Sequence, residues 1–278
     1  MSLDARLAGL DALLRPLPGL VVAFSGGVDS GVLLAAAVRA LGADRVVAAT
    51  AVSPSLPAAE LTGAAGFAAS LGVRHEQPRT DELSRAGYRA NAGDRCAFCK
   101  TELVEVLLPL AARLGIADVV TGTNADDVRA GFRPGIRAAA ERGAWTPLVL
   151  AGLTKDDVRA AARRWELPLA DKPAAACLAS RIAYGVPVSA AGLARVERAE
   201  SALRTALLRA GLPVRDLRVR DLGDDVARVE VDAELVDDVA ARPDLLVAVS
   251  GFARVELDPR GFRSGAMNEL LPDPVRYR

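Results

Sequence analysis

The chain has 278 residues, 51% of them hydrophobic, which is enough for one large or two modest globular domains. Lys plus Arg and Asp plus Glu each number 35, so there is no net charge to attract nucleic acid or a membrane surface. No stretch reaches the roughly 18 apolar residues of a membrane span, and no signal-peptide pattern is visible. We therefore predict a cytoplasmic protein with no nucleic-acid or membrane partner.

Apolar runs alternate with alanine- and leucine-rich stretches in the first 172 residues. The predicted strands cover residues 20–24, 46–52 and 118–122, and the predicted helices cover 31–41, 57–71, 101–114 and 154–165. This alternation is typical of a parallel sheet with helices on both faces. We predict a Rossmann-like α/β domain over residues 1–172, with ligands bound beyond the carboxyl ends of its strands.

A glycine turn flanked by hydroxyls follows the first predicted strand, in the segment Ser25-Gly26-Gly27-Val28-Asp29-Ser30. Glycine lets the backbone fold tightly and bring its N–H groups against an anion, and the two serines add hydroxyl donors. The helix that follows directs its positive N-terminal end at the same place. Neither a Gly-x-Gly-x-x-Gly pattern nor a Walker lysine is present. The segment predicts a phosphate-binding loop, and a purely structural turn is the alternative.

Two further groups of polar residues follow predicted strands of the same sheet. The candidates for nucleotide contact at these strand ends are Thr50, Ser53, Thr123, Asn124 and Asp127. Asn124, Asp126 and Asp127 have a second interpretation, since Asn and Asp are preferred residues at helix N-caps. The sequence leaves both interpretations open.

The pattern changes after residue 172. A long helix is predicted over residues 189–210, a short one over 234–241, and strands over 216–221, 227–232 and 252–257. Leu222-Gly223-Asp224-Asp225 is typical of a hairpin connection between the first two of these strands. We predict a smaller α+β domain over residues 173–278.

The three cysteines occur as the pair Cys96-Ala97-Phe98-Cys99 and the single Cys177. A Cys-x-x-Cys pair brings two thiols close enough to share a metal, and the third cysteine can complete an iron–sulfur site. A zinc site would need His75, the sole histidine, as its fourth ligand. The same cysteines are also compatible with a redox dithiol or with independent burial in the core.

Cys177 is also a candidate nucleophile by itself, without any cluster. The thiolate is the reactive form of cysteine, and a neighbouring cation favours it. Arg181 and Lys172 lie within five residues of Cys177 in the sequence and are the candidate cations.

Arg218 and Arg220 stand two apart on a predicted strand, so their side chains project to one face. Paired guanidinium groups suit a phosphate. The next predicted strand carries Glu230 and Asp232, so cross-strand ion pairs would explain the same pattern.

Motifs spread over almost the whole chain resemble the LarE family. The Ser25–Ser30 loop resembles the pyrophosphate loop of the ATP pyrophosphatases, which split ATP between its α and β phosphates. The other matching motifs are Arg95-Cys96-x-Phe98-Cys99-Lys100, Gly122-Thr123-Asn124-x-Asp126-Asp127, Arg133-Pro134-Gly135, Lys172-Pro173-x-x-x-Cys177-Leu178-x-Ser180-Arg181, Arg218-Val219-Arg220 and Gly261-Phe262-Arg263-Ser264-Gly265-x-Met267-Asn268-Glu269. The chain departs from the family pattern at Ala97, where a larger residue is common, and at Gly131-Phe132, where an Asp-Tyr pair is usual.

The resemblance implies an adenine nucleotide alpha hydrolase-like fold and an ATP-dependent sulfur transferase in the assembly of the nickel-pincer nucleotide cofactor. Family members adenylate the two carboxylates of pyridinium-3,5-biscarboxylic acid mononucleotide and convert them to thiocarboxylates. ATP and Mg²⁺ are the implied cofactors, with Asp29 as a magnesium ligand. The resemblance also implies that the protein is a homo-oligomer, which in this family is a hexamer.

The resemblance also implies roles for the three cysteines and for five substrate-binding residues. Because all three cysteines are present, it favours the branch in which Cys96, Cys99 and Cys177 bind a 4Fe-4S cluster that delivers sulfide. In the other branch, Cys177 gives up its own sulfur. Arg181 is implied beside Cys177 in catalysis. The implied substrate-binding residues are Arg133, Ser180, Arg218, Arg220 and Arg263.

Other functions share the pyrophosphate loop. An ammonia-using synthetase would not need the cysteines, and a tRNA thiolase would bind RNA in a salt-dependent way. The alternative that is not an enzyme is a protein module that binds ATP without turning it over.

Overall fold

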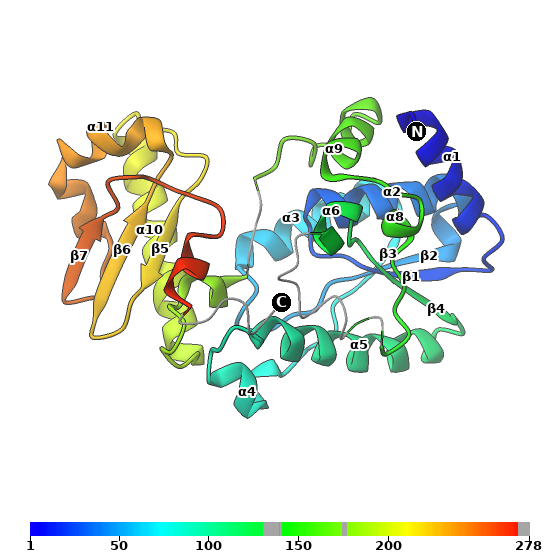
Figure 1. The fold of residues 1–278 in the computed structure, drawn as a ribbon, viewed down its shortest axis with the longest axis horizontal. Coiled ribbons are helices and arrows are strands. Elements are labelled where there is room, and N and C mark those ends of the chain that lie inside the picture. The colour runs from blue at the N-terminus through cyan, green and yellow to red at the C-terminus, as the bar shows by residue number, and fades with distance from the viewer. Residues whose placement is uncertain (130–138, 140, 174–176, 272–278) are drawn as a thin grey trace. The chain divides into compact units, whose positions relative to one another are not determined.

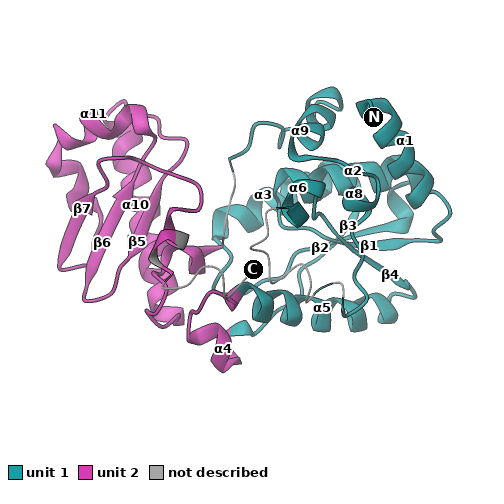
Figure 2. Cartoon of the chain, in the orientation of Figure 1, with its two compact units in different colours: residues 1–82, 96–175, 277–278 teal, residues 83–95, 176–276 magenta. Residues whose placement is uncertain are grey.

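The computed structural model describes residues 1–129, 139, 141–173 and 177–271, and the chain divides into two compact units (Figure 2). Unit 1 contains Met1–Glu82 and Cys96–Ala175. Unit 2 contains Leu83–Arg95 and the chain from Ala176 to Arg276. The chain therefore contributes to unit 2 twice, first through a short segment between two stretches of unit 1.

Unit 1 is built on a four-stranded parallel sheet with strand order β3-β2-β1-β4. The strands are β1 (Leu20–Ala23), β2 (Val46–Ala49), β3 (Arg74–Glu76) and β4 (Asp118–Thr121). The two central strands are short runs of apolar residues, as expected where both faces of a sheet are covered. The predicted Rossmann-like α/β class is confirmed. The chain order reverses at β1, which makes the carboxyl end of β1 the expected ligand position.

Helices cover both faces of this sheet, with α2 and α5 on opposite sides (Figure 1). Alternate β1 side chains enter different cores, since Val22 packs with residues of α2 and Val21 packs with residues of α5. The helices of unit 1 are α1 (Leu3–Leu14), α2 (Val28–Leu41), α3 (Ala58–Ser70), α5 (Arg95–Arg113), α6 (Ala125–Arg129), α8 (Pro147–Leu150) and α9 (Lys155–Arg164).

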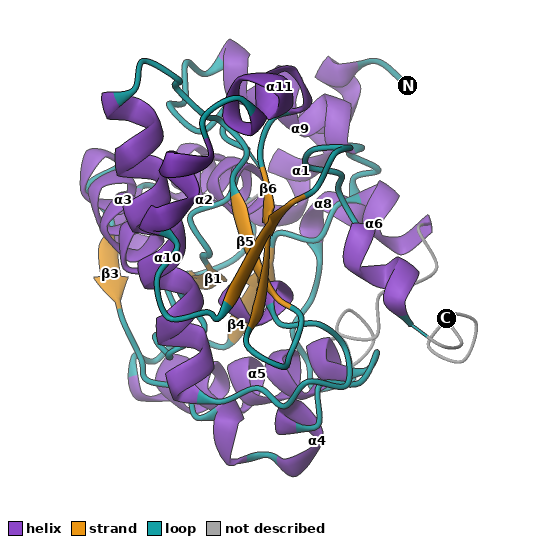
Figure 3. Cartoon of the chain, turned by 90° about the vertical axis from the view of Figure 1, so that its left-hand side faces the viewer, coloured by secondary structure: helices purple, strands orange, loops and turns teal. Residues whose placement is uncertain are grey.

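Unit 2 is an α+β unit whose sheet has the order β5-β6-β7 (Figure 1), and Figure 3 shows β5 and β6 of this sheet from the side. Its strands are β5 (Arg218–Asp221), β6 (Val226–Glu230) and β7 (Arg254–Leu257), and its helices are α4 (Ala86–Arg89), α10 (Ala190–Arg209) and α11 (Val236–Ala240). β5 and β6 are antiparallel, and Asp224 and Asp225 in their connection adopt positive φ angles of 50° and 56°. α10 packs on the sheet around an apolar core that includes Leu203, Leu207 and Val219.

Several elements differ from the sequence predictions. α2 begins at Val28 rather than residue 31, because the phosphate-loop residues form its first turn. α5 begins at Arg95 rather than residue 101, so Cys96 and Cys99 are helical. The strand Arg74–Glu76 is polar and was not predicted; its main chain pairs with the edge of β2. Among the described residues, no helix combines the length and apolarity needed to cross a membrane.

Candidate functional site

The phosphate loop joins β1 to α2, and its own serine hydroxyls hydrogen-bond within it. Gly26 has a φ of 74°, a left-handed conformation that suits glycine. The Ser25 N–H donates to Ser30 Oγ at 3.2 Å, and Ser30 Oγ–H donates to the Gly27 carbonyl at 3.2 Å. Gly27 is the N-cap and has no side chain to cap α2, so the first N–H groups of α2 are available to an anion.

The end of β4 packs directly on this loop. A Cβ at Gly122 would lie 2.6 Å from the Ser30 nitrogen, so only glycine allows the two segments to approach this closely. On the other side, Lys172 Nζ donates to the Gly26 carbonyl at 2.9 Å and to Glu60 Oε2 at 2.6 Å. In the sequence Lys172 stands out as a neighbour of Cys177 and as the first residue of one family motif, and no pattern there marks Glu60.

Asp29, the candidate magnesium ligand, is held at both carboxylate oxygens. Asn124 Nδ2 donates to Oδ1 at 3.0 Å, and Lys155 Nζ donates to Oδ2 at 2.5 Å. Lys155 was not predicted as a site residue, and the fold brings it to Asp29 from the start of α9. A Mg²⁺ ion at Asp29 would compete with the lysine for Oδ2, so the carboxylate fits a magnesium ion only if Lys155 releases it.

The residues after β4 make the hydrogen bonds expected of a helix N-cap. Asn124 Oδ1 accepts hydrogen bonds from the N–H groups of Asp126 and Asp127 at 2.9 and 3.1 Å, and Asp127 Oδ2 accepts from the Asn124 N–H. This is the reciprocal arrangement of a helix N-cap. Thr123 Oγ lies 3.3 Å from Thr121 Oγ. Nucleotide contact by Thr123, Asn124 and Asp127 stays a prediction.

The candidate residues after β2 bond to neighbouring segments of unit 1. Thr50 Oγ–H donates to the Phe24 carbonyl at 2.7 Å, so its oxygen accepts from His75 Nε2 at 2.8 Å. Burial holds the His75 pKa below its ordinary value of 6.5, against an opposing effect of Glu76. Ser53 Oγ donates to the buried Glu82 carboxylate at 2.5 Å. The Thr50 bond holds the carboxyl end of β2 beside Phe24, the residue that precedes Ser25.

The three cysteines belong to different units. Cys96 and Cys99 lie three residues apart in the first turns of α5 in unit 1, and Cys177 precedes the 3₁₀ helix Leu178–Arg181 in unit 2. Cys96 is exposed, and the other two are partly exposed. Within each unit, the described residues contain no group of three His, Cys, Asp or Glu side chains that could hold a metal ion. Convergence of all three thiols stays a prediction.

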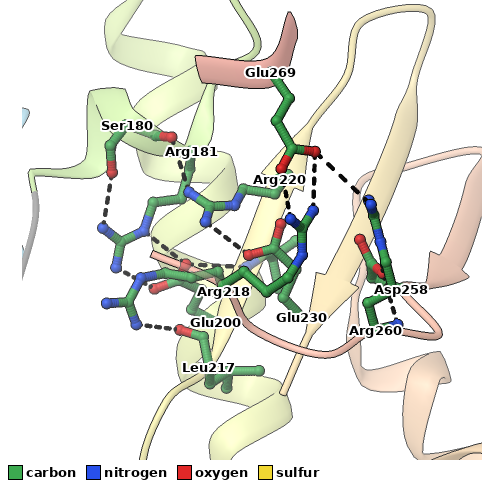
Figure 4. Close-up of polar contacts among 12 residues, drawn as sticks. Ser180, Arg181, Glu200, Leu217, Arg218, Arg220, Glu230, Asp258, Arg260 and Glu269 are labelled. Carbon is green, nitrogen blue, oxygen red and sulfur yellow. Dashed lines mark hydrogen bonds and ion pairs between the residues drawn. The ribbon is translucent and has the colours of Figure 1, made fainter. Parts of the chain in front are cut away.

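A buried arginine cluster lies on β5 and on the 3₁₀ helix Leu178–Arg181 of unit 2 (Figure 4). Arg181, Arg218 and Arg220 are each 4–6% exposed. Arg181 forms a two-pronged pair with Glu200, at 2.8 and 3.0 Å, and Arg220 Nη2 donates to Glu230 at 2.7 Å. The predicted cross-strand ion pair is therefore present at Arg220. The other expected partner, Asp232, instead accepts from main-chain N–H groups of residues 215 and 216.

The carboxylates of Glu200 and Glu230 accept from Arg181 and Arg220, and the charges of Glu200 and Asp216 act on Arg218. Burial, together with the charges of Arg181 and Arg220, lowers the pKa of Arg218 to about 10. Arg218 Nη1 donates to the Leu217 carbonyl, and its guanidinium lies 4.8 Å from the centre of the Phe262 ring. A bound anion beside Arg218 would favour its protonated form.

The remaining predicted site residues of unit 2 lie around the cluster or near the C-terminus. Ser180 Oγ–H donates to the Cys177 carbonyl at 2.7 Å, and Arg181 Nη1 donates to the same oxygen at 3.2 Å. Arg263 pairs with Glu269 at 2.5 Å on the surface, and this contact raises the pKa of Arg263. Arg133 lies outside the described residues.

The parallel sheet and the glycine loop between β1 and α2 define the class of this protein, an α/β protein consistent with a PP-loop nucleotide-hydrolase-like fold. No family model matches the chain. It is 39% identical over 274 residues to an uncharacterized protein of Synechocystis sp., covering 97% of this chain and 99% of the relative. It is 34% identical over 273 residues to the pyridinium-3,5-bisthiocarboxylic acid mononucleotide synthase of Lactiplantibacillus plantarum. This similarity covers 97% of this chain and 96% of the synthase. The chain therefore belongs to the family of that synthase, the LarE family.

Proposed function

We propose that this protein is an ATP-dependent sulfur transferase of nickel-pincer nucleotide cofactor biosynthesis. It adenylates the carboxylates of pyridinium-3,5-biscarboxylic acid mononucleotide and converts them to thiocarboxylates, releasing AMP and pyrophosphate. The near-full-length similarity to a synthase of the bisthiocarboxylic acid mononucleotide carries the proposal. The phosphate loop and the buried arginine cluster support it, because the reaction needs one site for each phosphorylated reactant.

Adenylation is required because a carboxylate is a poor electrophile. A carboxylate oxygen attacks the α-phosphorus of ATP, and the bond to the bridging oxygen breaks, so pyrophosphate leaves with the electron pair. The N–H groups at the start of α2 and the hydroxyls of Ser25 and Ser30 bind the departing phosphates. Lys155 and Lys172 also contact this loop, the first paired with Asp29 and the second with Glu60. Asp29 would hold a Mg²⁺ ion, which would supply charge neutralisation of the phosphates, and Lys155 would then contact the phosphates in place of Asp29.

The arginine cluster binds the phosphate of the mononucleotide substrate. A phosphate dianion at Arg218 stabilises the protonated guanidinium whose pKa burial has lowered to about 10. Arg220 and Arg181 are held in place by their carboxylate partners. Ser180 and Arg263 supply further donors to the substrate.

Sulfur is delivered at the cysteines. The chemistry of three thiolates suits a 4Fe-4S cluster, and Cys96 and Cys99 project from one face of α5 as two ligands of one group must. Cys177 is the proposed third ligand. When bound, the cluster supplies sulfide to the activated carboxyl carbon, from which AMP leaves. If no cluster binds, Cys177 is the sulfur donor itself.

Incubation with ATP, Mg²⁺ and the biscarboxylic acid mononucleotide tests the proposal. AMP, pyrophosphate and a thiocarboxylate are the expected products, and formation of ADP would contradict it. Ser30→Ala should lower AMP formation, while Thr205→Ala, a hydroxyl on the exposed side of α10, should leave it unchanged. ATP binding without AMP formation would indicate the non-catalytic module.

The source of sulfur is tested separately. Protein reconstituted anaerobically with iron and sulfide should absorb visible light, and Cys96→Ala should remove that absorption. A colourless protein that loses the mass of H₂S at Cys177 after turnover would instead identify Cys177 as a sacrificial donor. AMP formation that needs ammonia and none of the cysteines would indicate an amidating synthetase.

A further inference from the structure

The Asp29 carboxylate lies in the first turn of α2, and each of its oxygens accepts a hydrogen bond. Asn124 Nδ2 donates to Oδ1 at 3.0 Å, and Lys155 Nζ donates to Oδ2 at 2.5 Å. All three residues belong to unit 1. The two donors differ in how firmly they are held, and this difference decides which of them can leave Asp29.

Asn124 cannot leave Asp29 without breaking a helix cap. It is 2% exposed, and its Oδ1 atom accepts from the N–H groups of Asp126 and Asp127 at 2.9 and 3.1 Å. Because the amide oxygen is used in this way, the Nδ2 group must face Asp29. Rotation of the amide would bring an oxygen against the carboxylate and would leave the two N–H groups without their acceptor.

Lys155 is held firmly at its main chain only. It is the first residue of α9, and its N–H donates to Asp126 Oδ2 at 2.8 Å. The capping box of Thr154 and Asp157 also holds this end of the helix. The side chain is 37% exposed, and the flexible four-carbon stem of a lysine lets the ammonium group change partners. The start of α9 can therefore stay in place while the ammonium group moves.

A lysine is an unfavourable residue at this position of a helix. The helix dipole disfavours a cation in the first turn, where acidic residues are preferred. α9 follows this preference at Asp156 and Asp157 and departs from it at Lys155. The charge therefore serves the phosphate loop, through Asp29, rather than the stability of α9.

The ion pair responds differently to a metal ion and to a phosphate. A metal ion at Asp29 must displace the ammonium group from Oδ2, and the positive charge of Lys155 repels it. A phosphate at the first N–H groups of α2 attracts the same ammonium group. A metal–nucleotide complex supplies both partners at once, because its metal ion suits the carboxylate and its phosphates suit the lysine.

We infer that Lys155 is a specificity-determining residue that excludes a free divalent cation from Asp29 and favours the metal complex of a nucleotide. The protein then takes up its metal ion together with the nucleotide and not before it. This inference rests on the proposed function, from which the nucleotide and the magnesium ion are taken. It adds the order of binding and the residue that sets this order.

Binding of Mn²⁺ alone to the nucleotide-free protein tests the exclusion of free metal. Mn²⁺ prefers the same oxygen ligands as Mg²⁺, and its electron paramagnetic resonance signal reports the unbound ion. Lys155→Met and, independently, Lys155→Gln should each tighten Mn²⁺ binding about tenfold, because a unit charge a few ångström from a divalent ion repels it even through water. Adding Asp29→Asn to Lys155→Met should remove this gain.

Binding of α,β-methylene-ATP in excess Mg²⁺, measured by calorimetry, tests the contact with the nucleotide. This analogue cannot be split between its α and β phosphates, so the measurement needs no turnover. Both Lys155 variants should bind it about tenfold more weakly, the change produced by losing roughly one hydrogen bond to a charged group.

Arg163→Met is the matched control for both measurements. It also removes one cation from α9, but the partner of Arg163 is the surface carboxylate of Asp171, at 2.9 Å. Neither affinity should change in this variant. A melting curve confirms that each variant is folded.

The outcomes separate this inference from a structural role of Lys155 and from the proposed function. Weaker binding of both Mn²⁺ and the analogue, or unchanged Mn²⁺ affinity in the folded variants, would overturn the inference. A gain in Mn²⁺ binding that survives Asp29→Asn would also overturn it, because the ion would then be bound elsewhere. Neither measurement uses the mononucleotide substrate, so failure to form AMP and a thiocarboxylate would overturn the proposed function without changing these results.

Discussion

The close approach between β4 and α2 can be tested by adding one methyl group at Gly122. In Gly122→Ala the new Cβ would lie 2.6 Å from the Ser30 nitrogen and 2.7 Å from the Ser30 Cα. Non-bonded heavy atoms prefer separations of about 3.5 Å or more, so the two segments must move apart by roughly 1 Å. Both contacts are with main chain, which cannot rotate out of the way.

Two consequences are expected from this displacement. Overpacking of this kind destabilises a folded core by about 1–3 kcal/mol. The phosphate loop moves as well, and a misplacement of about 1 Å can cost roughly 100-fold in rate. We expect Gly122→Ala to lower the free energy of unfolding in urea and to lower AMP formation at saturating ATP.

Gly66→Ala is the matched control. Gly66 lies in the interior of α3, and a Cβ there would meet no atom within 4 Å. The same methyl group should therefore stabilise the protein, by about 0.5–1 kcal/mol. If Gly122→Ala unfolds within about 0.5 kcal/mol of the wild-type protein, the packing argument is refuted.

Three further predictions concern other parts of the molecule. Arg220→Met leaves the Glu230 carboxylate buried without its cation, so the free energy of unfolding in urea should fall by about 3–5 kcal/mol. The double variant Arg220→Met, Glu230→Gln should recover part of that loss, because it also removes the buried charge. Thr154→Ala removes the N-cap of α9 and should cost about 1 kcal/mol by the same measurement; a neutral result would contradict the cap. The His75 imidazole should titrate below pH 6.5 in an NMR pH series, because burial disfavours its charged form. The unfolded chain then binds the proton first, so stability falls as pH drops below 6.5, and His75→Gln should reduce that dependence.

The fold class could be predicted from sequence because its signals are local. Strands β1, β2 and β4 are apolar runs with helical stretches between them, and the segment Ser25–Ser30 stands at the junction of a strand and a helix. β3 was missed because its residues, Arg74–Glu76, are polar, and an edge strand is defined by main-chain pairing to its neighbour.

Pairs of charged residues distant in sequence depended on the tertiary structure. No spacing rule joins Lys155 to Asp29, or Lys172 to Glu60, because packing of α9 and of the loop after it brings each lysine to the phosphate loop. The alternation of β5 did place Arg218 and Arg220 on one face. Which of them paired with a carboxylate depended on the tertiary structure: Glu230 lies opposite Arg218 in the strand register but accepts from the diagonal neighbour Arg220, and Asp232 accepts from main-chain N–H groups.

The sequence by itself determined that this chain carries a phosphate loop, an arginine-bearing strand and three cysteines, since each depends on residue type and short-range periodicity. The tertiary structure alone decided that residues 83–95 leave unit 1 and join unit 2. The reason is physical: Asn91 is an ordinary polar residue in the sequence, and only the folded chain brings to it the three carbonyl groups of Ile182, Ala183 and Val186 that it binds.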